Sequence, residues 1–497
     1  MPRRDGPLRQ SLSLSSHGVG RRVAGGVGFQ LLGIGLRTLL TFGSTAFLAR
    51  LLTPADFGYV AMATVVTEFA ALLGTFGFSS VLVQRRVICR LQLDTLFWTL
   101  SVIGLLLALF VFGFSFVAVR VFDDATVGPL LRVMALNFAI GGLTAVPWVV
   151  LSRLMRFGAN FWIGIVTVVV RMAVAIGCAY AGLGMWSLVI GSLVGTITNA
   201  VMHFAYVPYL PRWRYHWPFI ARTWKTSASY FGNTALYYAS MNLDLLLIGR
   251  RLGAAPLGYY QNARSLTEEI RGRIAMPIQQ VLFPAFSSLQ NDAERFGQLV
   301  QRAGRLLAAA VVPVGVGVSA NAEALVLALY GEQWTAMIPV MAMFGFAAAL
   351  RASTAISIPL FNANDQAGLA FRYNVVGTLL TMAGVLVTMP FGVTAVAASV
   401  AVTSLFGLAT LARALKLIGL PPSALYRMLA APAVASAAMF LATWAASGWL
   451  LGPAPLRLLI QVAGGSVVYL GVLHLLSRQY LADFRQVLGV IRQRPQR

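Results

Sequence analysis

The chain has 497 residues, of which 58% are hydrophobic and only 11% are charged, and its 38 basic and 15 acidic residues give a net charge of +23. A soluble domain of ordinary composition carries about 25% charged residues, so this chain has too few charges to cover a water-facing surface. The composition excludes a soluble globular protein and indicates an integral membrane protein.

The positive charge is spread in short clusters between apolar runs and does not form one basic patch. This distribution is typical of membrane topology and argues against nucleic acid as a partner. The two cysteines, Cys89 and Cys178, fall in a basic loop and in an apolar run, so we expect no disulfide. Metal-binding spacings such as HExxH and CxxC, and the phosphate-binding GxxxxGKS/T loop, do not occur, so we expect neither a metal nor a cofactor.

Apolar runs follow one another along the chain. Since a membrane-spanning helix needs about 20 mainly apolar residues, we expect an all-α polytopic fold with about fourteen transmembrane helices. Twelve is the alternative if the last pair or the polar eighth segment has another role. The expected helices begin near Val23, Phe57, Leu93, Val127, Asn160, Gly184, Ser227, Ser265, Ala303, Thr335, Ala370, Gly392, Arg427 and Leu456.

Basic residues are concentrated in alternate connectors, such as PRWRYHWPFIARTWK from Pro211 and NDAERFGQLVQRAGR from Asn291. The connectors of the opposite set are poor in arginine and lysine. Because basic loops stay on the cytoplasmic side, we predict that both termini are cytoplasmic. The connector from Tyr209 to Thr226 is also rich in tryptophan, which suits a segment at the level of the lipid headgroups.

A short stretch that follows the first span, FLARLLTPADFGYV, is written a second time after the seventh span, as LLIGRRLGAAPLGYY. At an offset of 200 residues, Arg50, Leu52, Gly58 and Tyr59 meet identical residues. The repeat unit is therefore six spans, and because six is even, both halves enter the membrane in the same direction. Parallel repeats of this kind build transporters with a central cavity.

The repeat and the basic connectors together predict the organisation of the chain. We expect two pseudo-repeated lobes of six helices around a central cavity, followed by two extra helices. The expected boundaries are a basic cytoplasmic tail at 1–22, the first lobe at 23–210, a cytoplasmic linker at 211–226, the second lobe at 227–415, the extra helices at 427–477 and a second basic cytoplasmic tail at 478–497.

The stretches TAFLARLLTPADFGYVAMA and FGFSSVLVQRR resemble the start of Wzx-type polysaccharide exporters. MNLDLLLIGRRLGAAPLGYYQNA and PIQQVLFPAFSSLQND are similar to the middle of the same group. The subgroup that fits best contains the colanic acid, succinoglycan and xanthan exporters, within the multidrug/oligosaccharidyl-lipid/polysaccharide (MOP) flippase superfamily. The resemblance covers residues 20 to 420, and its motifs indicate kinship more firmly than substrate.

The resemblance implies a flippase that moves undecaprenyl-diphosphate-linked oligosaccharide across a bacterial inner membrane by alternating access. The implied partners are this polyprenyl-diphosphate-linked oligosaccharide and membrane lipids, with a polymerase and a chain-length regulator of the same pathway as candidates. A MATE-like small-molecule antiporter and a peptidoglycan lipid-precursor flippase of the same superfamily remain as alternatives. An enzyme is not expected, because the external connectors are short and no nucleophile–base pattern or DxD motif occurs.

Five arginines fall inside the expected spans: Arg37, Arg171, Arg271, Arg273 and Arg351. A charged side chain at the centre of a bilayer costs about 2.5–3.5 kcal/mol on insertion scales. These arginines must therefore line water, pair with acids or reach an interface. Arg171 and Arg351 are the weaker candidates for a site.

Arg37 lies near the middle of the first span, and Glu68 lies similarly deep in the second. A guanidinium group offers a planar fork that matches phosphate oxygens, so we predict that Arg37 attracts the diphosphate of the substrate in a cavity that includes Glu68. The alternative is a structural ion pair between Arg37 and Glu68.

The eighth span contains Glu268 three residues before Arg271, and Glu269 four residues before Arg273, which are neighbour spacings on a helix. We predict that either Arg271 or Arg273 reaches the cavity, and mutual pairing with the two acids is the alternative. Arg351 is a further cavity candidate that could instead extend to the cytoplasmic interface.

Asp244 lies in the seventh span beside Asn242. Isolated carboxylates inside a membrane often bind a proton or a cation, so Asp244 is a candidate for the coupling step. A structural role, near Arg250 or between the lobes, is the alternative.

Overall fold

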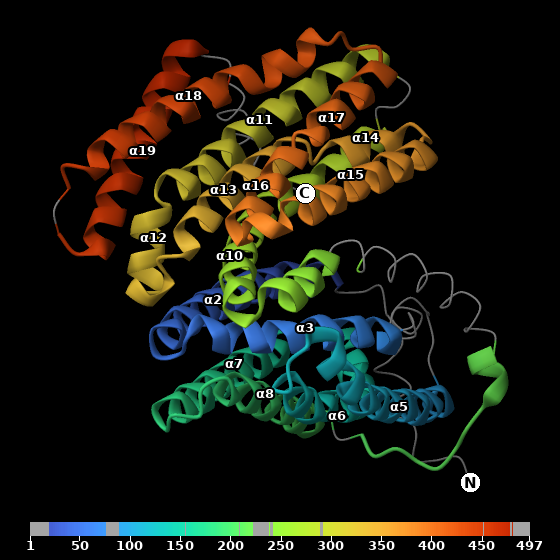
Figure 1. Cartoon of the computed structure of the whole chain (residues 1–497). Coiled ribbons are helices and arrows are strands. Elements are labelled where there is room, and N and C mark those ends of the chain that lie inside the picture. The colour runs from blue at the N-terminus through green and yellow to red at the C-terminus, as the bar shows by residue number, and fades with distance from the viewer. Residues whose placement is uncertain are drawn as a thin grey trace. The chain divides into compact units, whose positions relative to one another are not determined.

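The protein is all-helical in a computed structural model of the chain (Figure 1). Among the residues that the structure describes, helices are joined by turns and irregular loops and no strand occurs, which confirms the predicted fold class. The described residues are 19–75, 89–154, 156–207, 209–221, 238, 242–288, 292–450, 452–477 and 480.

The chain divides into two compact units, Met1–Leu257 and Gly258–Arg497. The first unit contains α2 (Val19–Leu51), α3 (Pro54–Thr75), α5 (Arg90–Phe122), α6 (Val127–Arg153), α7 (Phe157–Tyr180) and α8 (Trp186–Tyr206). Helix α10 (Ala254–Ser288) begins in the first unit and continues in the second. The second unit goes on with α11 (Ala293–Ala320), α12 (Ala322–Leu329), η1 (Glu332–Trp334), α13 (Met337–Ser353), α14 (Ser357–Ala363), α15 (Ala367–Thr388), η2 (Met389–Phe391), α16 (Val393–Thr403), α17 (Phe406–Leu417), α18 (Ser423–Ser447) and α19 (Ala454–Leu476).

Twelve segments of the described chain are long and apolar enough to cross a membrane. They correspond in order to the first six and the last six of the fourteen expected spans. The eighth expected span is α10, a helix of 35 residues whose polar side chains keep it out of that set. The seventh lies largely outside the described residues, and the part that is described, 242–252, is helical.

The repeated stretch has the same local structure in both copies. In the first copy α2 ends at Leu51 and α3 begins at Pro54. In the second copy the helical residues 242–252 are followed by Gly253, at a φ of 89°, and α10 begins at Ala254. The two helix starts are therefore separated by the same 200 residues as the sequence repeat.

The two copies also touch each other inside the first unit. A Cβ placed on Gly58 of the first copy would lie 1.8 Å from the carbonyl oxygen of Ala254 in the second. Only glycine permits the backbones to approach this closely, so the repeated Gly-Tyr pair includes a packing position.

The third helix of the first unit, α5, crosses the fourth, α6, at two glycines. A Cβ on Gly104 would lie 2.6 Å from the carbonyl oxygen of Phe138, and one on Gly142 would lie 2.5 Å from that of Leu100. Small residues let helix backbones come close, which is how membrane helices gain packing contacts without a hydrophobic driving force.

The second unit repeats this crossing with α11 and α13, the helices at the equivalent places in its order. A Cβ on Gly315 would lie 2.6 Å from the backbone nitrogen of Ala349, and one on Gly345 would lie 2.7 Å from the carbonyl oxygen of Gly315. The internal repeat therefore extends from the short sequence match to the packing of helix pairs.

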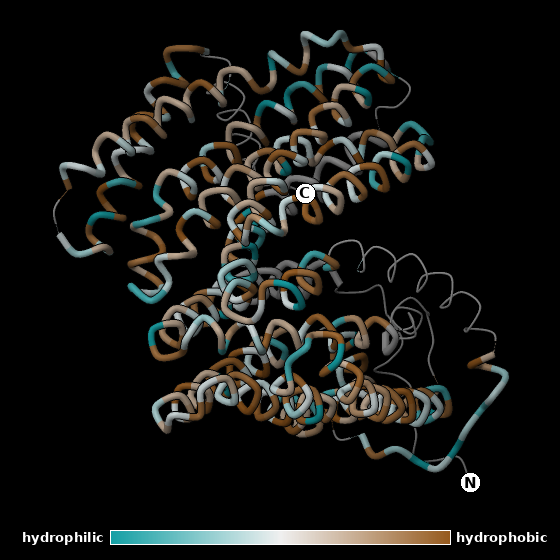
Figure 2. The backbone as a smooth tube through the Cα atoms, in the orientation of Figure 1, coloured by the Kyte–Doolittle hydropathy of each residue, from teal (hydrophilic) through white to brown (hydrophobic). Residues whose placement is uncertain are grey.

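Hydrophobic residues are frequent along the helices of both units, as Figure 2 shows, and many of them are exposed. On α5, Leu105, Leu106 and Leu109 are 53–60% exposed, whereas Leu107 and Val111 on the inner face are buried. A helix that is hydrophobic all round is suited to lipid on one side and protein on the other. The exposed leucines therefore mark the side that faces the acyl chains.

We predict that Gly142→Ala lowers the thermal stability of the purified protein, because the new methyl group would displace α5 from α6. Overpacking of this kind costs about 1–3 kcal/mol. Gly141→Ala is the matched control, because a Cβ on Gly141 has nothing within 4 Å. Melting curves of the two variants in the same detergent compare them directly, and equal melting temperatures would show that the close crossing does not limit stability.

Candidate functional site

Arg37 lies on α2 with a half-buried side chain. Its Nε donates a hydrogen bond to the carbonyl oxygen of Gly33 at 3.0 Å. The guanidinium group lies over Gly164 of α7, where a Cβ would come within 2.7 Å of Nη1. Glycine at position 164 therefore leaves room for the guanidinium group inside the first unit, and among the described residues no carboxylate is paired with it.

Glu68 is exposed on α3 and accepts a hydrogen bond from the hydroxyl of Tyr238 at 3.0 Å. It lines a cavity of about 490 Å³ between α3, α5, α6 and α8, together with the polar side chains of Asn137, Ser192 and Thr196. The ion pair between Arg37 and Glu68 that the sequence left open does not occur among the contacts of the described residues. The partner of Glu68 is a tyrosine 170 residues further along the chain.

Glu268 is the centre of a charged network in the second unit. Its Oε2 accepts hydrogen bonds from Nε and Nη2 of Arg271 at 2.7 and 2.6 Å. Its Oε1 accepts from Nη1 of Arg351 at 3.1 Å. One carboxylate on α10 therefore joins a guanidinium on its own helix to a guanidinium on α13.

Arg351 is held from a third helix as well. Its Nε donates to the hydroxyl oxygen of Ser404 at 3.1 Å, and this hydroxyl in turn donates to the carbonyl oxygen of Val400 on α16 at 2.7 Å. The side chains of Arg351, Arg271 and Glu268 are 33%, 27% and 28% exposed. Two cations against one anion leave this half-buried network with a net charge of +1.

Arg273 forms a separate ion pair with Glu269, and both side chains are more exposed, at 38% and 44%. This pair is neutral and lies on a single helix. The structure thus distinguishes the two arginines of α10: Arg271 belongs to the network with surplus positive charge, and Arg273 belongs to a closed pair. Both pairings have the helical spacing that the sequence indicated.

The other two intramembrane candidates lie in the first unit. Arg171 is exposed on α7, and its stem packs over Gly195 of α8, where a Cβ would lie 3.1 Å from the Cβ of Arg171. Asp244 lies among the helical residues 242–252, and its Oδ1 accepts from the backbone N–H of Leu245 at 2.9 Å. Neither residue joins the Glu268 network.

The participation of Arg351 is the feature that sequence reasoning missed. Arg351 and Glu268 are 83 residues apart, so no neighbour spacing connects them. The available signal was the shortage of intramembrane acids, which forces arginines on different helices to share a carboxylate. In the described part of the chain, no three His, Cys, Asp or Glu residues are grouped as a metal site would require.

Comparison with known proteins gives relatives along most of the chain. The chain is 25% identical over 346 residues to the succinoglycan biosynthesis transport protein ExoT of Rhizobium meliloti, a match that covers 70% of each chain. It is 23% identical over 346 residues to the lipopolysaccharide biosynthesis protein WzxC of Escherichia coli, covering 68% of this chain and 70% of that one.

Two solved structures have a similar fold. The lipid II flippase MurJ in an inward closed conformation aligns with a TM-score of 0.67 at 15% identity, over 90% of this chain and 99% of that one. An inward-facing multidrug resistance transporter of the MATE family, from the MOP superfamily, aligns with a TM-score of 0.57 at 13% identity, over 79% of this chain and 96% of that one.

The family described as polysaccharide biosynthesis protein matches residues 47–339, which include both copies of the repeated stretch and the acidic and basic residues of α10. This match spans more than half of the chain, and the chain therefore belongs to that family of multi-pass membrane proteins.

Proposed function

We propose that this protein is a flippase that moves polyprenyl-diphosphate-linked oligosaccharide units across the bacterial inner membrane, for assembly of a surface polysaccharide outside the cell. The observation that carries the proposal is the network of Arg271, Glu268 and Arg351, with its surplus positive charge inside a membrane unit. An anionic, phosphate-bearing substrate complements that charge.

The relatives support this substrate class. The proteins with similar sequences are named for succinoglycan biosynthesis transport, lipopolysaccharide biosynthesis and teichuronic acid biosynthesis. The fold is shared with a flippase for a lipid-linked precursor and with a drug transporter, so the fold alone is compatible with both classes. The family match and the charge of the site favour the lipid-linked glycan.

Glu268 has a defined part in the proposed binding step. Without substrate, its two oxygens occupy the donors of Arg271 and Arg351. A diphosphate offers more acceptor oxygens and more negative charge than one carboxylate, and guanidinium groups bind phosphate oxygens in a planar, two-pronged geometry. The diphosphate therefore takes the place of Glu268, which acts as an internal substitute for the substrate anion.

Arg37 is proposed as a second cationic contact for the substrate, contributed by the first unit. It has five N–H donors and uses one of them on the Gly33 carbonyl. Glu68 belongs to the cavity between α3, α5, α6 and α8, where a carboxylate and several hydroxyls are suited to sugar hydroxyl groups. Arg273, already neutralised by Glu269, is the weaker candidate.

The transport cycle is proposed to be alternating access, with both termini on the cytoplasmic side. Asp244 is the candidate for coupling to a proton or a cation, because an intramembrane carboxylate is the usual group for that step. A polymerase and a chain-length regulator of the same pathway are the proposed protein partners. The product would be a glycan displayed outside the cell on its lipid carrier.

A drug antiporter of the MATE type is less well supported. A site for cationic drugs needs acidic side chains that are available to the drug, whereas the adjacent acids of α10 are both engaged by arginines. A flippase for a peptidoglycan precursor would share the diphosphate chemistry. The matches to proteins of polysaccharide biosynthesis favour the surface glycan.

We predict that Arg271→Ala and Arg351→Ala each reduce polymer export by about tenfold or more, because a hydrogen bond to a charged group contributes about 1.5–3 kcal/mol. Arg37→Ala should also reduce export, and Arg273→Ala should reduce it least. Export is measured in a deletion strain complemented with each variant, together with membrane levels of the protein and the lipid-linked repeat units retained inside.

Two outcomes of this experiment would separate the site from the function. Normal export by Arg271→Ala at normal membrane levels would remove the Glu268 network from the translocation path. A deletion strain that still exports every surface glycan would refute the flippase function itself.

We further predict that Glu268→Gln increases the affinity for a diphosphate-bearing lipid, because the two arginines lose the anion that competes with the substrate. Binding is followed as the rise in melting temperature of the purified protein with added polyprenyl diphosphate. Glu269→Gln is the matched control, since its partner Arg273 lies outside the network. An unchanged or lower affinity in Glu268→Gln would contradict the role of Glu268 as a substitute anion.

A further inference from the structure

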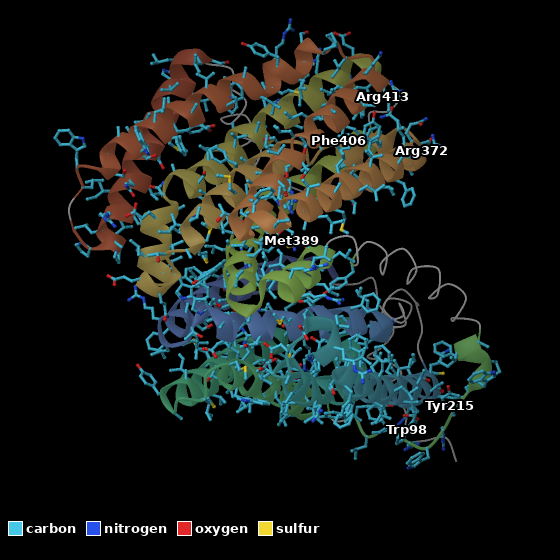
Figure 3. All side chains as sticks on the ribbon, in the orientation of Figure 1. Trp98, Tyr215, Arg372, Met389, Phe406 and Arg413 are labelled. Atoms are coloured by element: carbon cyan, nitrogen blue, oxygen red, sulfur yellow. The ribbon has the colours of Figure 1, made fainter. Side chains whose placement is uncertain are left out.

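After α8 the chain runs as an irregular segment along the first turns of α5, to which hydrogen bonds join it. We call residues 209–217 the interfacial strap. Figure 3 labels Tyr215 of the strap and Trp98 of α5, which lie at the same end of the first unit. The same end of the unit carries the start of α5 at Arg90 and the end of α8 at Tyr206.

A buried carboxylate anchors the beginning of the strap. Asp94 on α5 is fully buried, and its Oδ1 accepts from the hydroxyl of Tyr209 at 2.5 Å and from the backbone N–H of Arg212 at 3.3 Å. Burial, together with the hydrogen bond to Asp94, raises the pKa of the Tyr209 phenol above its ordinary value, so the phenol remains a donor. A buried hydrogen-bonded pair of this kind fixes one geometry.

Three further contacts hold the strap against α5. Nε1 of Trp98 donates to the carbonyl oxygen of Arg212 at 3.0 Å, and the backbone N–H of His216 donates to the hydroxyl oxygen of Thr95 at 3.1 Å. The hydroxyls of Thr99 and Tyr215 are 3.2 Å apart. These contacts satisfy polar groups of the strap from the protein side. The ring of Trp213 stacks on that of Trp98, with 3.9 Å between the centroids, and the rest of Trp213 is exposed.

The outward side of the strap combines tryptophan with arginine. Trp213 is 86% exposed and Trp217 is 65% exposed, and Arg212 and Arg214 are also exposed. Tyr209 at the start of the strap, and Phe219 and Ile220 just after it, are buried in one apolar cluster with residues of α5 and α6. Figure 2 shows a hydrophilic stretch in this segment between more hydrophobic neighbours.

A surface that combines exposed tryptophans with arginines is typical of the boundary between a membrane and water. Tryptophan is enriched where a membrane meets water, because its ring is apolar and its N–H is polar. From Val207 to Ala221 the sequence contains no acidic residue, so nothing in the segment neutralises Arg212 and Arg214. A positively charged segment with outward tryptophans has the composition of a site for a negatively charged lipid surface.

We propose that the interfacial strap binds anionic phospholipid headgroups. Arg212 and Arg214 bind headgroup phosphates, and Trp213 and Trp217 insert at the boundary between headgroups and acyl chains. The occupant is the lipid of the surrounding leaflet. This binding is independent of the transported substrate, because it rests on residues outside the proposed substrate site.

A local measurement of lipid preference tests this proposal. A fluorophore is attached to the full-length protein at Trp213→Cys, in a background where Cys89 and Cys178 are serine, and the protein is reconstituted in lipid nanodiscs. Quenching is compared between phosphatidylglycerol and phosphatidylcholine that carry a nitroxide near the headgroup. Each arginine near an anionic surface contributes about a fivefold preference, so we expect about 25-fold enrichment of phosphatidylglycerol at this position.

The controls separate this site from general charge. Arg212→Gln/Arg214→Gln should abolish the preference, whereas Arg212→Lys/Arg214→Lys should retain most of it. Arg372→Gln/Arg413→Gln removes the same charge from the second unit, where Figure 3 labels both arginines, and should leave the preference at position 213 unchanged. Melting temperatures confirm that each variant is folded.

Two results would overturn the proposal. Equal quenching by the two lipids would show an ordinary interfacial tryptophan without anionic selectivity. No quenching by either lipid would place the strap in water. A fluorophore at Trp449→Cys provides the reference for a lipid contact that lacks neighbouring arginines, since Trp449 is 88% exposed in the loop between α18 and α19.

Discussion

The carboxylate of Glu268, shared by Arg271 and Arg351, joins α10 to α13 and is the interaction on which the proposed substrate site rests. A bilayer offers no water to solvate a charge, so the arginines of α10 and α13 are tolerated because one acid and one serine hydroxyl receive their donors. The three groups are not electrically neutral, since two guanidinium groups share one carboxylate. That imbalance leaves a net positive charge, which is the property that the proposed binding of an anionic substrate uses.

Much of the fold was predictable because lipid imposes length and composition on every span. The order of twelve spans followed from apolar runs, whereas the eighth helix begins at Ala254, inside the second copy of the repeat, and not near Ser265 as expected. The pairs Glu268–Arg271 and Glu269–Arg273 followed from helical spacing. These features depend on residues close together in the chain, and the spacing of residue types along a helix predicts contacts of that kind.

The contacts of the candidate site join helices that are far apart in the chain. The spacing of residues along the sequence does not predict such contacts. Arg351 reaches Glu268 across 83 residues. From the sequence we expected Arg37 and Glu68 at similar depths in successive helices, but Glu68 contacts Tyr238, and Arg37 covers a glycine of α7. Which way each side chain points around its helix axis depends on the facing helices, such as the glycine at position 164 that leaves room for Arg37.

The length of α5 has a consequence for the membrane that surrounds it. With 33 residues at 1.5 Å each, α5 is about 50 Å long, whereas the hydrocarbon core of a bilayer is about 30 Å thick. Asp94, Thr95 and Trp98, which bind the strap, lie in the first three turns of this helix. With the strap at the headgroups, as proposed, these hydrogen bonds would hold the first turns of α5 at that level, and a bilayer of different thickness would strain them before it strained the helix core.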